Sequence, residues 1–236
     1  MPRVACILLL LATLGVGLAP SPQAAASLLL GSLEQPAPVP EIVPQWQRAL
    51  AAIRRETPTI EACARDRATC HGPLAAWLDR LDALKDATPA AKVAGVQAFL
   101  NDWPYRTDLE VYGRSDLWAS PLQFLAHGGD CEDFAIAKYV SLRRLGLPAE
   151  RLRIVVLEDT ERQVAHAVLT VRLDGEVLVL DNLLAAPVPQ ERLTHYVPYY
   201  SVNELGQWQH ARPTLALAAG TAVLGTIPPA PPASTR

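Results

Sequence analysis

Hydrophobic residues recur at steps of three and four through the first half of the chain. This spacing predicts amphipathic helices over residues 45–56 and 73–87. Thr88 and Pro89 form a helix N-cap followed by a first-turn proline, so a third helix is expected to begin there. The first half of the chain is therefore predicted to be helical.

An irregular, aromatic segment follows these helices. Residues 101–126 are punctuated by glycine and prolines, which predicts a long loop or cleft wall. A further helix is expected to start at Cys131 and to run to about Leu145, because Gly146 and Pro148 would end it.

The hydrophobic period changes in the second half of the chain. Residues 152–158, 165–173 and 176–182 are short apolar runs typical of strands. Asp174 and Gly175 separate the last two runs, and Asp-Gly between apolar segments is a strong signal for a two-residue hairpin turn. Helices followed by antiparallel strands predict an α+β fold.

The predicted hairpin carries a histidine and an aspartate to one surface. With Asp174 and Gly175 as the turn, Asp181 lies opposite Val168, two residues from His166 on the same face. Cα atoms of such diagonal neighbours lie about 7 to 8 Å apart, within reach of a His–Asp hydrogen bond. Both faces are otherwise apolar, so the pair is either functional or a satisfied structural pair.

The two ends of the chain differ from its middle. Within residues 1–26, Arg3 precedes an apolar run, and small residues follow that run. This order is typical of a secretory signal peptide. The run is short for a membrane span of about 20 residues, so an uncleaved anchor is the alternative. Residues 27–44 predict a proline-rich extended arm, 45–210 the folded domain, and 211–236 a low-complexity disordered tail.

Export changes the interpretation of the cysteines, because disulfides persist outside the cytoplasm. Cys63 and Cys70 stand seven residues apart and are expected to form a local disulfide, with two separate buried thiols as the alternative. Cys131 is then an odd thiol, and such a thiol in an exported protein is a candidate reactive group. A small core residue is the alternative for Cys131.

The overall composition excludes one class of partner. Half of the 236 residues are hydrophobic and 19% are charged, as in a globular domain. The formal net charge is -3, and no basic run of the kind that grips phosphates is present. Nucleic-acid binding is therefore not expected.

Cys131, His166 and Asp181 form a candidate nucleophilic triad. A helix start favours the thiolate through its dipole, His166 would exchange the proton, and Asp181 would orient His166. The Cys131 backbone N–H is a natural oxyanion donor, with Trp118 as a candidate second donor. A zinc site through the triad residues is a weaker alternative, because they offer only three ligands.

Three sequence blocks resemble the bacterial transglutaminase-like cysteine proteinases. They are GGDCEDFAIAKY, AHAVL and LVLDN. The resemblance extends over about residues 46–208 and includes NDWPYRTD before the first block and YYSVNELGQW after the last. It implies a papain-like α+β fold, with a catalytic cysteine at a helix N-terminus packed on an antiparallel sheet. The triad of the family falls on Cys131, His166 and Asp181.

The resemblance also implies calcium dependence through the acidic residues around the nucleophile. These are Asp130 and Glu132, with Asp133 as a further candidate. Carboxylates raise the pKa of a nearby thiol, but a bound divalent cation turns them into ligands, and oxygen ligands suit calcium. The alternative is that they only complement the helix dipole as first-turn acids.

For function, the resemblance implies a periplasmic endopeptidase that is not inserted in the membrane after signal cleavage. In this family's known system the substrate is the N-terminal region of a large surface adhesin. An inner-membrane receptor for cyclic di-GMP sequesters the protease, so that its release controls biofilm attachment. Two alternatives stay open: acyl transfer through the same thioester, as in transglutaminases, and a non-catalytic calcium-dependent interaction module.

Overall fold

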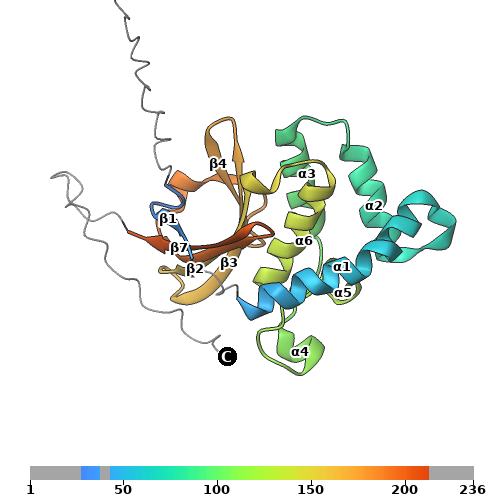
Figure 1. Ribbon diagram of the computed structural model, residues 1–236, viewed down its shortest axis with the longest axis horizontal. Helices are drawn as coiled ribbons and strands as arrows, with labels where there is room; N and C mark the ends of the chain where they lie inside the picture. The colour runs from blue at the N-terminus through green and yellow to red at the C-terminus, as the bar shows by residue number, and fades with distance from the viewer. Residues whose placement is uncertain (1–27, 38–42, 213–236) are drawn as a thin grey trace, which may run out of the picture.

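The computed structural model describes residues 28–37 and 43–212. The expected signal peptide at 1–26 and nearly all of the expected tail therefore lie outside the described residues. Within them, a layer of helices packs against one face of a seven-stranded sheet, with α6 between the sheet and the other helices (Figure 1). The predicted α+β class is confirmed. None of the described helices combines the length and apolar character that a membrane crossing requires.

The helical layer contains the helices predicted from hydrophobic spacing. Thr88 caps the third of them by accepting a hydrogen bond from the Ala91 backbone N–H, as expected. The main helices are α1 (Pro44–Arg65), α2 (Gly72–Leu84), α3 (Pro89–Asn101), α4 (Asp108–Tyr112), α5 (Pro121–His127) and α6 (Cys131–Arg144).

Helix α1 continues well beyond the predicted end at Glu56. Pro58 lies inside the helix and removes one backbone hydrogen bond. The buried side chains of Ile60 and Cys63 favour continuation, because they pack into the main core only if the helix goes on. The expected disulfide is present and joins Cys63 in the last turn of α1 to Cys70 beyond the end of the helix.

The segment predicted as one long loop contains two short helices. Helix α4 has five residues and α5 has seven, too short for hydrophobic periodicity to reveal them. Their N-terminal signals were visible in the sequence. Thr107 and Glu110 form a capping box, and Ser120 precedes a first-turn proline.

All neighbouring strands of the sheet are antiparallel, in the order β1-β7-β6-β2-β3-β4-β5. In the predicted hairpin Leu173 faces Glu176 and Leu169 faces Leu180, which confirms the predicted register. Strands β6 and β7 were not predicted from periodicity. The strands are β1 (Leu33–Pro36), β2 (Leu152–Asp159), β3 (Val164–Leu173), β4 (Glu176–Leu180), β5 (Val188–Pro189), β6 (Tyr196–Asn203) and β7 (Gly206–Ala211).

Both faces of the central strands are buried. Ile154, Leu169 and Val171 face the helical layer and belong to the main core. Val168 and Val179 face the other way, into a smaller core. Burial on both faces explains why these strands are almost continuously apolar in sequence.

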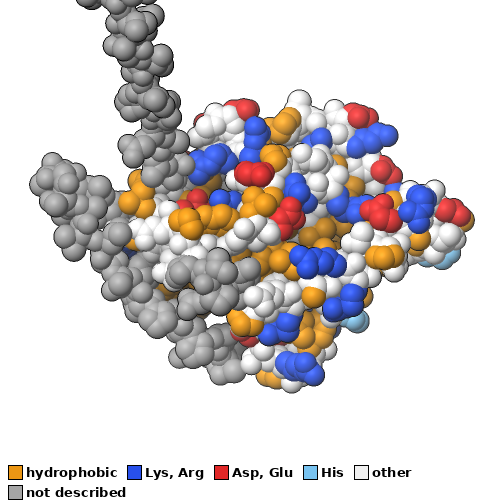
Figure 2. Space-filling view, viewed as in Figure 1, with side chains coloured by type: hydrophobic (Ala, Val, Ile, Leu, Met, Phe, Trp, Pro, Cys, Tyr) orange, Lys and Arg blue, Asp and Glu red, His pale blue; other side chains and the backbone are white. Residues whose placement is uncertain are grey.

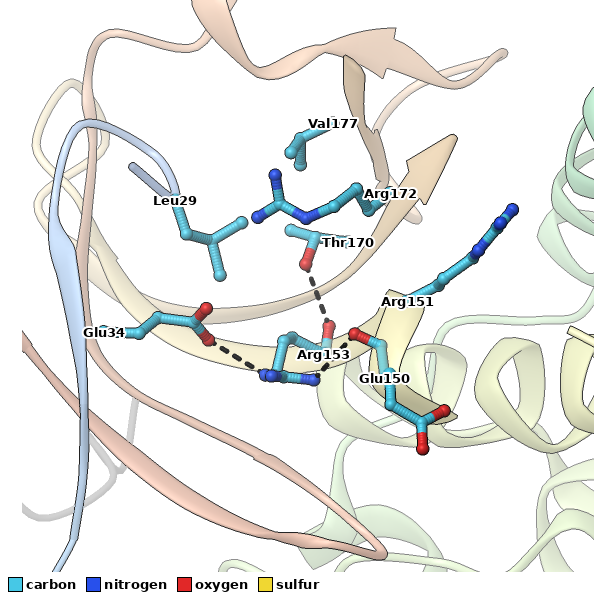
Figure 3. Close-up of a pocket in the computed structure, with 8 residues that line it drawn as sticks. All are labelled: Leu29, Glu34, Glu150, Arg151, Arg153, Thr170, Arg172 and Val177. Carbon is cyan, nitrogen blue, oxygen red and sulfur yellow. Dashed lines mark hydrogen bonds and ion pairs between the residues drawn. The ribbon is translucent and has the colours of Figure 1, made fainter. Parts of the chain in front are cut away.

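Part of the expected arm belongs to the sheet. Strand β1 pairs with β7, and Leu29 just before it is buried in the smaller core. Glu34 of β1 forms an ion pair of 2.9 Å with Arg153 of β2 (Figure 3). The Arg153 guanidinium also lies 3.7 Å from the centroid of the Trp208 ring. The extended segment is thus held by backbone pairing, an ion pair and apolar burial.

From inside the protein, His210 of β7 bonds to Ser201 of β6 and to Ser32, the residue just before β1. Its Nδ1 lies 2.7 Å from the Ser32 hydroxyl and its Nε2 lies 2.9 Å from the Ser201 hydroxyl. Burial, reinforced by the positive charge of Arg153, lowers the pKa of His210 to about 4. The imidazole is therefore neutral in the folded protein at neutral pH.

Acid should destabilise the fold through His210. Because its folded pKa lies below the unfolded value of about 6.5, the unfolded chain binds the proton first, and stability falls as pH drops from about 6.5 towards 4. Between pH 7 and 4.5 the expected loss from this group is roughly 2–3 kcal/mol. Urea unfolding at both pH values measures it.

The variant His210→Gln provides the comparison, because glutamine can bridge both hydroxyls without titrating. Carboxyl groups titrate in both proteins, so the difference between the two pH slopes isolates His210. Equal slopes in the two proteins would contradict the assignment.

Candidate active site

Two glycines place Cys131 at the first position of α6. Backbone hydrogen bonds join the segment at Gly129 to the chain around Tyr105, which forms a parallel bridge with Gly129. Gly128 has a φ of 79°, and a Cβ atom there would overlap the carbonyl oxygen of Pro104. The two glycines therefore let two backbone segments approach closely beside the thiol.

The predicted hydrogen bond between His166 and Asp181 is confirmed. His166 Nε2 lies 3.0 Å from Asp181 Oδ1, and the side chains are 5% and 0% exposed. Since Asp181 accepts from Nε2–H, Nδ1 is the ring nitrogen left to exchange a proton with a thiol. The pair thus has the tautomer that nucleophilic catalysis requires.

Further donors hold Asp181 as an ionised acceptor. The Tyr196 hydroxyl donates to Oδ2 at 2.6 Å and the Leu183 backbone N–H donates to Oδ1 at 2.9 Å. Burial acts to raise the pKa of Asp181, but these hydrogen bonds and that of His166 outweigh it and lower the pKa. Tyr196 was missed in sequence analysis, because it lies on β6, a strand that periodicity did not predict.

The thiol of Cys131 lies beside strand β3 but is paired with a carboxylate. Its Sγ donates to Glu132 Oε2 at 3.2 Å, and the Ala167 backbone N–H of β3 acts to lower the pKa of the thiol. Within residues 28–37 and 43–212, no hydrogen bond joins Cys131 to His166. Burial, followed by the charges of Glu132 and Asp130, raises the pKa of the thiol well above its ordinary value.

The acidic residues at the start of α6 form a cluster with one member that sequence analysis missed. Carboxylate oxygens of Asp108, Asp130 and Asp133 all lie within 4.8 Å of one another. Asp108 comes from α4, inside the segment predicted to be a loop. Asp130, Cys131 and Glu132 form a second such group around the thiol.

Two oxygens of this cluster are buried without a hydrogen-bond partner. They are Oδ1 of Asp108 and Oδ1 of Asp130. Burial, then the charge of Glu132, raises the pKa of Asp130 to about 9, and burial with the charge of Asp133 raises that of Glu132 to about 7. Such a cluster needs either protons or a cation, and unpartnered carboxylate oxygens fit a hard divalent ion.

Asp133 has a structural role within the cluster. Its Oδ1 accepts from the Ala119 backbone N–H at 2.6 Å and its Oδ2 from the Asp130 backbone N–H at 3.3 Å. These bonds tie the start of α6 to the segment that carries Trp118, whose ring packs 6.4 Å from that of Trp46. The role of Trp118 as second oxyanion donor stays a prediction.

The geometry argues against zinc at the triad. In the part of the chain that the structure describes, the groups able to share one metal ion include neither His166 nor Asp181. Both oxygens of Asp181 are already engaged by His166, Tyr196 and Leu183. A metal at this place would have to displace bonds that orient the histidine.

A thiol at a helix N-terminus, beside a His–Asp pair on an antiparallel sheet, defines the class of papain-like cysteine peptidases. Residues 57–214 match the family model described as bacterial transglutaminase-like cysteine proteinase, and the chain belongs to this family. It is therefore a cysteine peptidase, which confirms the predicted enzyme class.

Solved structures agree with the family assignment. LapG of Legionella pneumophila matches with a TM-score of 0.57 and 32% identity, over 64% of this chain and 87% of that one. Its calcium-bound form matches with a TM-score of 0.56 and 32% identity, over 64% and 86%. Its EGTA-treated form matches with 0.57 and 29%, over 70% and 89%. No curated protein matches the chain.

Gly129 should tolerate no side chain. A Cβ atom there would overlap the Asp133 carboxylate, so Gly129→Ala should lower stability by about 1–3 kcal/mol and change alkylation of Cys131 by iodoacetamide. Gly206→Ala is the matched control, because its Cβ would lie 3.7 Å from the Trp208 ring, an ordinary contact. Thermal unfolding and labelling rates that do not distinguish the two variants would contradict this packing.

Proposed function

We propose that this protein is a periplasmic, calcium-dependent cysteine endopeptidase that cleaves the N-terminal region of a large surface adhesin. Its catalytic residues are Cys131, His166 and Asp181. The observation that carries the proposal is the 3.0 Å hydrogen bond between His166 and Asp181, which starts from strand β3, the strand on which the helix that begins at Cys131 packs.

The chemistry follows from the positions of these groups. The Cys131 thiolate attacks the scissile carbonyl carbon after His166 Nδ1 has taken the thiol proton. The same proton passes to the leaving amine as the C–N bond breaks, which leaves a thioester on Cys131. Water then attacks the thioester with His166 as the base, and the thiol is regenerated.

Asp181 and the helix start support these steps. Asp181 keeps Nε2 protonated and stabilises the imidazolium that forms on His166. The Cys131 backbone N–H lies in the first turn of α6 and has no carbonyl partner within the helix, so it can donate to the oxyanion.

Calcium is proposed for the acidic cluster. Asp108 and Asp130 each offer an unpartnered buried oxygen, and Glu132 forms a second possible ligand group with Asp130. Calcium-bound and EGTA-treated forms of LapG support the choice of ion. When bound, calcium supplies the positive charge that these carboxylates lack.

Location and partners are proposed from the sequence and the family. Residues 1–26 predict export, and the disulfide between Cys63 and Cys70 fits an oxidising compartment. An adhesin substrate and an inner-membrane cyclic di-GMP receptor that sequesters the protease are proposed from what the family resemblance of the sequence implies. Membership of a peptidase family sets aside the non-catalytic module. Acyl transfer would proceed through the same thioester and would differ from hydrolysis only in that an amine, instead of water, attacks it.

Removing the nucleophile should abolish cleavage and keep the fold. Cys131→Ala and His166→Ala should show no cleavage of a purified adhesin N-terminal region, while Asp181→Asn should lose about 10²- to 10⁴-fold in kcat/KM. Gel analysis gives cleavage, and circular dichroism checks folding. His71→Ala is the control, because this exposed histidine lies far from the triad in sequence and caps nothing. Substantial cleavage by Cys131→Ala would overturn the triad.

Chelation should abolish cleavage and lower thermal stability. Calcium should restore both far better than magnesium, whose octahedral shell resists dehydration. Asp130→Ala, Glu132→Ala and Asp108→Ala should each reproduce the chelated state. Calorimetric titration of calcium into the Cys131→Ala protein measures binding directly.

Asp102→Ala is the control for loss of a surface carboxylate, because Asp102 is exposed at the end of α3. It should keep the calcium response of the parent protein. Full cleavage in excess EGTA, with no stabilisation by calcium, would show that the cluster only complements the helix dipole.

A further inference from the structure

Gln97 is a fully buried glutamine on α3. Its side chain is 0% exposed, whereas Figure 2 shows charged side chains of both signs spread over the outer surface. Asn101 follows four residues later and therefore lies on the same face of the helix. A buried amide needs hydrogen bonds to offset its loss of contact with water, so its partners indicate its role.

The two amides donate to the same pair of backbone carbonyls. Gln97 Nε2 lies 2.6 Å from the backbone oxygen of Asp181 and 2.7 Å from that of Leu184. Asn101 Nδ2 lies 3.1 Å and 2.8 Å from the same two oxygens. Four hydrogen bonds therefore join α3 to the short turn that follows β4 and carries Asp181.

The turn from Asp181 to Leu184 is also bonded within itself. The Leu183 backbone N–H donates to Asp181 Oδ1 at 2.9 Å, and that of Leu184 donates to the Asp181 backbone oxygen at 3.3 Å. A turn that is bonded to itself can still move as a unit. The amides of α3, a helix that packs on α6, attach it to the helical layer.

Both amides leave their own oxygens without a partner. Gln97 Oε1 and Asn101 Oδ1 are buried and accept no hydrogen bond within the described residues. A buried acceptor without a partner costs free energy, so stability alone is a poor reason for these two side chains. Their donors are directed at the turn that carries a proposed catalytic residue.

We propose that Gln97 and Asn101 are positioning residues of the peptidase, which hold the Asp181 turn against α3 so that its carboxylate stays aligned with His166. The proposal rests on the proposed function, because it takes the pair of His166 and Asp181 as part of the catalytic machinery. It goes beyond the triad by assigning a role to two side chains of α3. In the described part of the chain, neither amide bonds to Cys131 or His166.

Precise placement matters at Asp181 because its carboxylate serves several donors at once. Oδ1 lies 3.0 Å from His166 Nε2, and Oδ2 accepts from the Tyr196 hydroxyl at 2.6 Å. Hydrogen bonds weaken steeply when their angle is lost, and a misplacement of about 1 Å can cost about 100-fold in rate. Because the amides do not contact the reacting atoms, kcat should suffer more than KM.

The test removes the amide donors and keeps the size of each side chain. In full-length protein, Gln97→Met and Asn101→Leu should each lower kcat by about 10- to 100-fold with little change in KM. In protein carrying Cys131→Ala, the low-field NMR resonance of the proton on His166 Nε2 should move upfield and exchange faster with water, because its bond to Asp181 is weaker. Its absence from His166→Ala assigns the resonance.

Asn203→Leu is the matched control. Asn203 is likewise a buried amide whose Nδ2 bridges two backbone oxygens, those of Ala149 at 2.8 Å and Leu152 at 3.1 Å. Leu152 lies at the opposite end of β2 from the residue that faces His166. The control should lose stability in urea unfolding without a lower kcat or a moved resonance.

A normal kcat and an unmoved resonance in the folded variants would overturn the proposal and leave the two amides as structural. Equal changes in Asn203→Leu would also overturn it, because they would reflect general loosening. If Gln97→Met does not fold, Asn101→Leu decides alone, since Asn101 is the half-buried last residue of α3.

The NMR measurement uses protein without the nucleophile, so its result does not depend on peptidase activity. Failure of the proposed function would appear instead as cleavage by the Cys131→Ala protein.

Discussion

Buried negative charge at the first turn of α6 is the constraint on which the active site depends. Asp130 and Glu132 lie around the thiol, Asp108 and Asp133 share a second group with Asp130, and burial raises the pKa of each carboxyl group. Without compensation these groups favour a protonated thiol that donates to Glu132. A cation bound in the cluster would reverse the sign of the local field and would favour the thiolate, so the proposed metal binding and nucleophile activation would be coupled.

The second half of the site solves a different electrostatic problem. Asp181 stays ionised although it is fully buried, because His166, Tyr196 and the Leu183 backbone N–H all donate to it. On the sheet side, hydrogen bonds therefore offset the cost of burying the Asp181 charge. On the helix side, buried oxygens of Asp108 and Asp130 have no such partners. The two halves meet where α6 packs on β3.

The packing around the site holds these buried charged side chains in place. Two cores cover the two faces of the central strands, and the N-terminal strand β1 closes the edge next to β7. Gly128 and Gly129 show how little freedom remains near the thiol, since a methyl group at either position would overlap a neighbour. Rigid packing of this kind keeps the catalytic groups within the small tolerance that catalysis needs.

Local patterns in the sequence were enough for the helix that begins at Cys131, for the hairpin register that pairs His166 with Asp181, and for the disulfide between Cys63 and Cys70. Each depends on residues close together in the chain, where a cap, a turn or a short loop sets the geometry. Asp108 and Tyr196 needed the tertiary structure. Asp108 comes from a helix too short to show a period, and Tyr196 comes from a strand that was not predicted. Their roles arise from packing between distant segments, which decides burial and therefore the strength of every charge in the site.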